Sequence, residues 1–196
     1  YSSRGPVDDG RIKPDVLAPG GDINTTNMNN GYQQQRPGTS FAVPHVAGSA
    51  ALLMQLWKSR NSNQEPLPST IKALFIQGAE DMRNPGPDYE AGYGQINVTT
   101  SANLIARTDQ NNKYVLENQI RQGETHEYFI RVQSSEDLKA TLVWDDKEGT
   151  LNANRNLIND IDLKFISPMG SLGLPYVLDP QNPSNNAVVG EDHTNN

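Results

Sequence analysis

The sequence predicts an α/β domain over residues 1–108, followed by an all-β domain of the sandwich or jelly-roll type over residues 109–196. Two observations carry this prediction. Before about residue 108, apolar residues recur at helical spacing, and loops rich in Gly and Pro separate these segments. After it, apolar residues alternate with polar ones at every second position, as in strands with one buried face. A length of 196 residues allows one large or two small domains.

Composition excludes several classes of function. The formal net charge is −7, which argues against a nucleic-acid partner. No apolar run approaches the roughly 18 residues of a membrane span, so no membrane partner is expected. The absence of Cys excludes disulfides, a cysteine nucleophile and a zinc site of the finger type.

The first domain is expected to begin with loops and one short buried strand, residues 15–18, which Pro19-Gly20 terminates. A helix then follows from Thr39 to about Arg60. Its stretch 41–57 is apolar almost all round, and a helix that is apolar on every face is normally buried in the middle of a domain.

Two shorter helices complete this domain. The first has Ser69 or Thr70 as its expected N-cap and Gly78 as its C-cap. The second covers residues 100–105. Alternation then predicts four strands in the second domain, at residues 114–116, 127–132, 140–144 and 161–166.

The segment from Gly38 to Gly48, Gly-Thr-Ser-Phe-Ala-Val-Pro-His-Val-Ala-Gly, places Ser40 at the start of the long helix. The first turn of a helix has unpaired N–H groups and the positive end of its dipole. A serine there can attack a carbonyl, and its own N–H can stabilise the resulting oxyanion. Gly38 would let a substrate backbone approach closely, and Gly48 would let another element pack tightly.

A structural interpretation stands beside this one, in which Ser40 is only an N-cap. His45 lies five residues further along, about 500° around the helix, and is not placed to be the base for Ser40. We therefore expect His45 to be a packed helix histidine.

The run from Gly38 to Gly48 resembles the catalytic-serine motif of subtilisin-like serine proteases, the subtilase or peptidase S8 family. Residues 2–6 and 13–20 resemble the family segment that precedes this serine, and residues 93–97 resemble the lead into its last helix. The resemblance covers about residues 1–106, in the family order. It implies the C-terminal part of a catalytic domain that contains a parallel sheet.

The resemblance also implies roles for individual residues. Ser40 would be the nucleophile and would contribute its N–H to the oxyanion hole, Thr39 would support that hole, and Gly38 would contact substrate. The family's catalytic Asp and His precede the serine, yet residues 1–39 contain no His. We therefore expect both in sequence before Tyr1, with the N-terminal half of the catalytic domain as a partner, and we predict that this chain alone is inactive.

The implied function is a secreted endopeptidase that hydrolyses protein or peptide substrates through an acyl-enzyme and needs no cofactor for its chemistry. The alternative is a catalytically inactive subtilase-like fragment, or a binding or adhesion module. The intact Gly38-Thr39-Ser40 favours the first reading, because an inactive relative need not keep this serine.

The second domain has a family counterpart as well. Residues 141–146, 157–163 and 168–170 resemble the β-sandwich that follows the catalytic domain in some larger bacterial subtilases. The final segment 192–196 resembles a stretch that leads into further strands there, so the second domain is expected to be incomplete. Five of its residues could supply hard oxygen ligands for a structural calcium ion: Asp145, Asp146, Asn159, Asp160 and Asp162. Asp and Asn at turns and strand ends equally need no metal.

Overall fold

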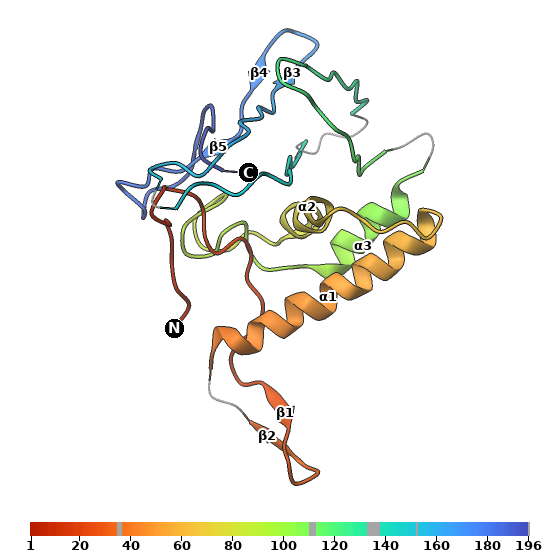
Figure 1. Cartoon of the computed structure of the whole chain (residues 1–196), viewed down its shortest axis with the longest axis vertical. Coiled ribbons are helices and arrows are strands. Elements are labelled where there is room, and N and C mark those ends of the chain that lie inside the picture. Colours follow the sequence, from red (N-terminus) through yellow and green to blue (C-terminus); the bar gives the residue numbers. More distant parts are fainter. Residues whose placement is uncertain (35–36, 110–112, 133–137, 152, 196) are drawn as a thin grey trace.

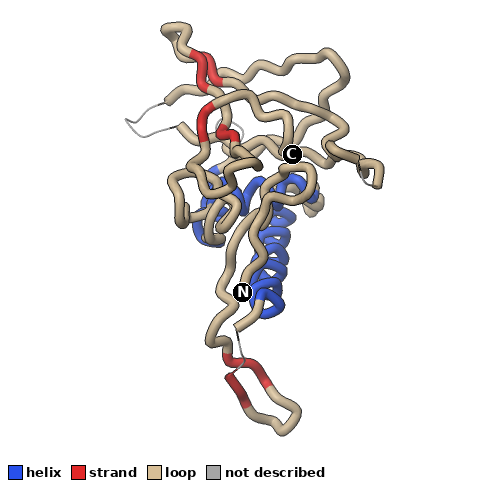
Figure 2. Tube along the Cα trace, turned by 90° about the vertical axis from the view of Figure 1, so that its left-hand side faces the viewer, coloured by secondary structure: helices blue, strands red, loops and turns tan. Residues whose placement is uncertain are grey.

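In the computed structural model, the described residues form three helices and three small antiparallel sheets (Figure 1). The structure describes residues 1–196 except 35–36, 110–112, 133–137, 152 and 196. The helices lie together in the body of the molecule, and the sheets lie outside them (Figure 2). Within the described residues, no helix is long and apolar enough to cross a membrane.

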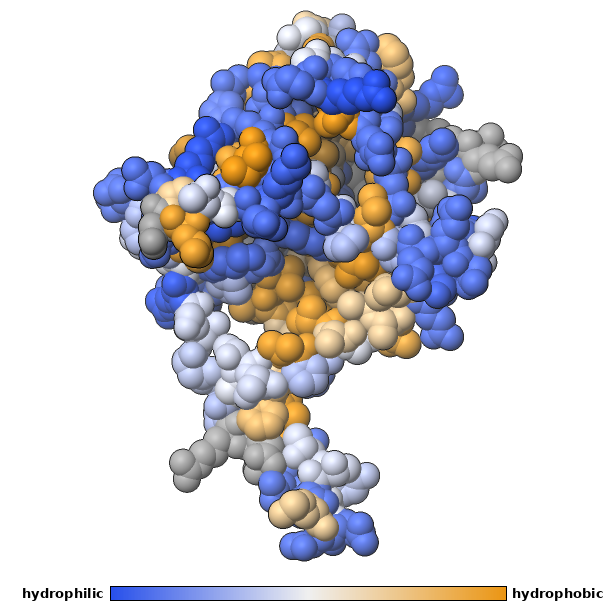
Figure 3. All heavy atoms as spheres, viewed as in Figure 1, coloured by the Kyte–Doolittle hydropathy of each residue, from blue (hydrophilic) through white to orange (hydrophobic). Residues whose placement is uncertain are grey.

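Helix α1 spans Thr39–Arg60, as the sequence predicts. Its predicted burial is wrong for this chain, because only Leu53 and Trp57 are buried. Val43 is 63% exposed and Leu52 is 61% exposed. One side of α1 packs against the other two helices, and its apolar side chains remain visible on the surface elsewhere (Figure 3). A Cβ built on Gly48 would meet nothing within 4 Å, so the expected close packing there is also absent in this chain.

Helix α2 spans Pro68–Gly78, with Leu67 at its N-cap position. It thus begins before the predicted caps, because proline is well suited to the first helical position. Gly78 is its last residue rather than its cap, and its lack of a side chain serves packing. A Cβ on Gly78 would lie 2.5 Å from the Ser101 hydroxyl oxygen.

Helix α3 spans Val98–Arg107 and is longer than predicted. The side chain of Asn97 caps it by accepting a hydrogen bond from the Thr100 N–H at 3.0 Å. Ser101 donates its hydroxyl to the Leu74 carbonyl of α2 at 2.8 Å, which joins the two helices. The three helices share one core cluster, formed by Leu53, Trp57, Leu74, Phe75 and Ile105.

A hairpin projects from the body just before α1 (Figures 1 and 2). Its strands β1, Asn24–Thr26, and β2, Tyr32–Gln34, pair antiparallel, with Thr25 opposite Gln33. In the described residues the predicted parallel sheet is reduced to a single parallel bridge between Leu17 and Gln95. The strand predicted at residues 15–18 is therefore one bridge long.

The region after α3 contains two further antiparallel sheets. Strand β3, Phe165–Ile166, pairs with β4, Leu172–Gly173, and β5, Tyr176–Val177, pairs with β6, Val188–Val189. The remaining described residues of this region are irregular, so the β-sandwich is not confirmed.

Three of the four predicted strands in this region, 114–116, 127–132 and 140–144, are wrong, and of 161–166 only the last two residues are a strand. Alternation marks a face that a sheet could bury, but a strand also needs a paired neighbour. Phe129 shows the consequence, because it remains 97% exposed.

Candidate active-site serine

Ser40 is the second residue of α1 and is exposed, as is Thr39 before it. Gly38 is the N-cap residue in an extended conformation, with φ −174° and ψ 146°. Ser40 is therefore not the N-cap that the structural interpretation requires. Since α1 begins at Thr39, the Ser40 N–H belongs to the first turn and has no carbonyl one turn earlier within the helix. A hydroxyl and a first-turn N–H without a partner in the helix thus lie at the same residue.

A close backbone contact fixes the chain just before this serine. The Gly38 N–H donates a hydrogen bond to the Gly20 carbonyl oxygen at 2.9 Å. A Cβ on Gly20 would lie 2.8 Å from the Gly38 carbonyl oxygen, so only glycine fits there without displacement. The Phe41 N–H in turn bonds to the Gly38 oxygen at 3.0 Å. The turn Pro19-Gly20 therefore positions the start of α1.

Backbone hydrogen bonds also join the segments around residues 15–20 and 93–97. The Leu17 N–H donates to the Gly94 carbonyl at 2.8 Å, and the Ile96 N–H donates to the Leu17 carbonyl at 2.9 Å. The fold thus brings together three segments that are far apart in the sequence: 13–20, 38–48 and 93–97.

Asp15 connects this framework to α2. Its carboxylate pairs with Lys13 and, at 3.3 Å, with the Lys72 ammonium group of α2. Burial raises the pKa of Asp15, but the hydrogen bond from Lys13 and the charges of Lys72 and Lys13 outweigh it. The pKa of this carboxyl therefore lies below its ordinary value.

All three histidines lie against groups other than Ser40. The Nδ1 atom of His45 is 2.8 Å from the Phe41 carbonyl, and the side chain is exposed, so the expected packing of His45 is wrong. His126 faces Glu124, and His193 faces Asp160. In the described part of the chain, no histidine is hydrogen-bonded to Ser40.

The five acidic and amide residues considered for calcium lie in three different places. Asp145 bonds to Ser69 at the start of α2. Asp146 accepts hydrogen bonds from the Ile158 N–H at 2.8 Å and from the Asn159 side chain at 2.5 Å. Burial raises the pKa of Asp146, yet the hydrogen bonds from Ile158, Asn159 and Lys147 outweigh it, so this pKa is lowered.

Of the five, Asp160 and Asp162 are the two that lie in a group of potential metal ligands within the described residues. They do so with His193, and one potential ligand atom of each lies within 4.8 Å of the others. Sequence reasoning does not identify His193 as their partner, although His193 lies in the segment 192–196. Asp160 also accepts a hydrogen bond from Arg155 at 2.8 Å.

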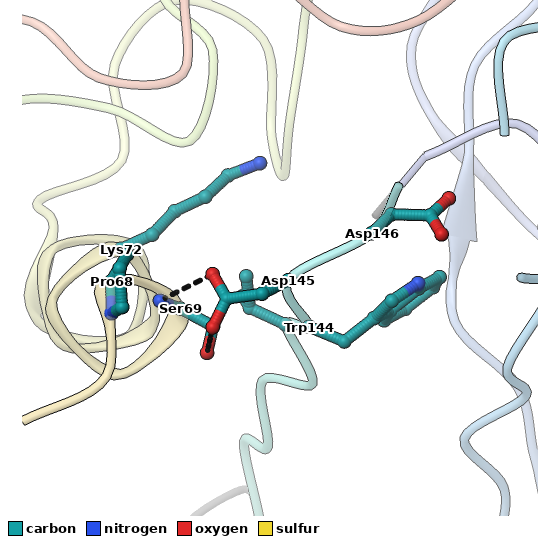
Figure 4. Close-up of a pocket in the computed structure, with 7 residues that line it drawn as sticks. Pro68, Ser69, Lys72, Trp144, Asp145 and Asp146 are labelled. Atoms are coloured by element: carbon teal, nitrogen blue, oxygen red, sulfur yellow. Dashed lines mark hydrogen bonds between the residues drawn. The ribbon is translucent and has the colours of Figure 1, made fainter. Parts of the chain in front are cut away.

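A shallow cavity of about 290 Å³ lies away from the serine, between α2 and residues 143–146 (Figure 4). Lys72 and Trp144 line it, and Asp145 reaches across to Ser69. The buried Trp144 indole N–H has no hydrogen-bond partner among the described residues.

Comparison with known proteins decides the family. The model of the subtilase family, Peptidase S8, matches residues 1–94, which include Ser40, the segments 13–20 and 38–48, and the start of the segment 93–97. Residues 1–94 belong to the subtilase family. The expected resemblance is therefore confirmed, and this part of the chain is a fragment of a subtilase catalytic domain.

Individual relatives agree with this assignment. A PII-type proteinase of Lactococcus lactis subsp. cremoris is 48% identical over 103 residues, which cover 50% of this chain and 5% of that protein. Pyrolysin of Pyrococcus furiosus is 38% identical over 54% of this chain and 8% of its own length.

The Dictyostelium discoideum protein named serine protease/ABC transporter B family protein tagA is 28% identical over 85% of this chain and 11% of its own length. That similarity extends past the subtilase segment. The chain thus spans 5% to 11% of these curated relatives. Among solved structures, the CspB protease of Clostridium perfringens matches with a TM-score of 0.47 and 31% identity, over 51% of this chain and 22% of that one.

Proposed function

We propose that this chain carries the nucleophile of a secreted subtilisin-like serine endopeptidase, and that Ser40 is that nucleophile. The observation that carries the proposal is the place of Ser40: it is exposed in the first turn of α1, inside the subtilase segment. Its substrates are proteins or peptides, the class expected for a relative of proteinases.

The proposed reaction begins when the Ser40 hydroxyl oxygen attacks the scissile carbonyl carbon and transfers its proton to a histidine base. The Ser40 N–H donates a hydrogen bond to the oxyanion of the tetrahedral intermediate, and Thr39 supports this site. The histidine then protonates the leaving amine as the C–N bond breaks, which leaves an acyl-enzyme. Water hydrolyses the ester in a second half-reaction that returns the proton to Ser40.

The histidine and its orienting aspartate come, in this proposal, from sequence that precedes Tyr1. The exposed apolar residues of α1 support this view, because uncovered Val43 and Leu52 are unusual for a helix of such composition. The N-terminal half of a subtilase domain would cover them. No further group is needed for the chemistry, and Gly38 leaves space for a substrate backbone.

The test compares the 196-residue chain with the longer protein that contains it. We expect no casein hydrolysis by the chain alone and Ser40-dependent hydrolysis by the longer protein. Ser40→Ala should abolish that activity, whereas Ser59→Ala, at the far end of the same helix, should leave it unchanged. Hydrolysis by the isolated chain that Ser40→Ala removes would contradict the need for preceding sequence. Full activity of the Ser40→Ala variant in the longer protein would favour the alternative role as a binding module.

A further inference from the structure

Helix α2 lacks the local residues that normally satisfy helix ends. The ends of a helix expose unpaired N–H and C=O groups with partial positive and negative charges, respectively. Leu67 at the N-cap position has no side-chain acceptor, and the first turn of α2 contains no acidic residue. Its last turn contains no basic residue. Charged side-chain partners for both ends therefore come from outside the helix.

Two carboxylates from the region after α3 bind the N-terminal end of α2. Asp145 accepts hydrogen bonds from the Ser69 N–H at 3.1 Å and from the Ser69 hydroxyl at 2.8 Å (Figure 4). Glu117 accepts hydrogen bonds from the Leu67 N–H at 3.0 Å and from the Thr70 hydroxyl at 2.5 Å. Negative charge thus meets the positive end of the helix at two points.

A cation from the same region binds the C-terminal end. The Lys139 ammonium group donates hydrogen bonds to the carbonyls of Ile76 and Gln77, each at 3.2 Å. The Gln77 side chain donates to the Lys139 carbonyl at 3.1 Å and accepts from the Thr141 hydroxyl at 2.7 Å. Positive charge therefore meets the negative end.

We propose that Glu117, Lys139, Thr141 and Asp145 form a helix clamp, an interaction surface whose partner is α2 of the subtilase segment. The clamp makes the region after α3 part of the same folding unit as the catalytic segment, rather than a separately folding accessory domain. Both signs of charge are placed as the helix dipole requires, at opposite ends of one helix, and the residues of the clamp lie far from α2 in the sequence.

The clamp is coupled to the helix that carries Ser40 through the shared core. Leu74 and Phe75 of α2 pack in one cluster with Leu53 and Trp57 of α1. Loosening the ends of α2 should therefore loosen the contact between α2 and α1. This inference is independent of whether Ser40 is catalytic.

The two tryptophans of the chain allow a direct test. Trp57 lies in the shared core, and Trp144 directly precedes Asp145 of the clamp. Trp144→Phe leaves a probe of the core, and Trp57→Phe leaves a probe of the clamp region. We unfold each single-tryptophan form of the 196-residue chain in urea and measure the midpoint by fluorescence and by circular dichroism. We expect the two midpoints to coincide in both forms. Two separated transitions would overturn the proposal.

Substitutions in the clamp should then shift both probes together. We expect Asp145→Asn and Lys139→Gln each to lower the midpoints of both probes by the same amount. The matched controls are Glu148→Gln and Lys147→Gln, which change the same charges on exposed side chains away from α2. A shift of the Trp144 probe alone, or equal shifts from the controls, would overturn the proposal.

If the tryptophan substitutions prevent folding, hydrogen exchange provides a second test. In the chain with both tryptophans, Asp145→Ala, which removes both carboxylate acceptors, should lower the protection of α2 amide hydrogens about tenfold, the size of a lost N-cap. Protection of residues 50–57 of α1 should fall as well. Unchanged protection in both helices would contradict the proposal.

Discussion

The Gly38 N–H donates a hydrogen bond to the Gly20 carbonyl oxygen at 2.9 Å, two residues before Ser40. This contact joins the turn that ends the segment 13–20 to the start of α1. It requires glycine on the Gly20 side, where a Cβ would lie 2.8 Å from the Gly38 oxygen. The position of the proposed nucleophile therefore depends on a backbone contact that no side chain supplies.

Replacing Gly20 should impair catalysis in the longer protein. We expect Gly20→Ala to displace Gly38 and with it Ser40, and to lower kcat/KM about a hundredfold, since a misplacement of about 1 Å can cost that much. Gly21→Ala is the matched control, because its Cβ would meet only the Tyr1 hydroxyl, at 3.4 Å. Equal kinetics for Gly20→Ala and the wild type would show that this contact does not position the serine.

Gly48→Ala should have opposite effects in two contexts. In the 196-residue chain the new methyl group meets open space, and alanine favours the helix, so the free energy of unfolding should rise by about 1 kcal/mol. In the longer protein we expect a loss of stability, because preceding sequence would pack against α1 at this glycine. Thermal unfolding of both proteins measures whether Gly48→Ala raises or lowers stability in each of them. Stabilisation in both would mean that nothing packs closely at Gly48.

Asp15 should make stability depend on pH in the acid range. Its pKa is lower in the folded chain than in the unfolded one, where about 3.9 is ordinary. The ion pairs with Lys13 and Lys72 therefore stabilise the fold above about pH 4, and this contribution is lost as the pH falls through the folded pKa. We expect Asp15→Asn to cost roughly 1 kcal/mol at pH 6 and progressively less towards pH 3. Urea unfolding at each pH measures this, with exposed Asp8→Asn as the control; a pH-independent cost would contradict the assignment.

Calcium remains a prediction for the residues after α3. If Asp160 and Asp162 bind it, millimolar calcium should raise the melting temperature and a chelator should lower it, because a ligand of the folded state stabilises by mass action. Asp162→Asn should remove the shift, whereas Asp179→Asn, which lies in a separate turn, should preserve it. An identical melting temperature with calcium and with chelator would contradict the prediction of a calcium site. The acidic residues would then be solvated turn and strand-end positions.

Local signals predicted the helices well, and with them the place of Ser40 in the first turn of α1. The apolar period and the Gly-Thr-Ser start place α1 correctly, and a helix forms its own hydrogen bonds, so a local pattern suffices. The ends of α2 were less predictable, because Asp145 and Lys139 contact it from far along the chain. The strands at 127–132 and 140–144 failed for the same physical reason, since strands need partners that alternation alone does not specify.

In the candidate site, too, features that are local in the sequence are predictable and contacts between distant segments are not. Ser40, Thr39 and Gly38 are predicted together because they are adjacent in one motif, and their roles stay a prediction. The acidic residues were grouped by closeness in sequence, yet Asp145, Asp146 and Asp160 take part in three separate sets of contacts. No pattern within the chain could have paired Asp160 with His193, because only the fold brings the final segment back to it.

The most direct test of the central claim is covalent labelling of the longer protein with a fluorophosphonate probe, which reacts with activated serine nucleophiles. We predict a single adduct, located by peptide mass spectrometry on Ser40, with loss of casein hydrolysis in proportion to labelling. Ser40→Ala should remove both the adduct and the activity, and Ser59→Ala should remove neither. An adduct on another serine that accounts for the activity, or hydrolysis that survives Ser40→Ala, would contradict the assignment of Ser40 as the nucleophile.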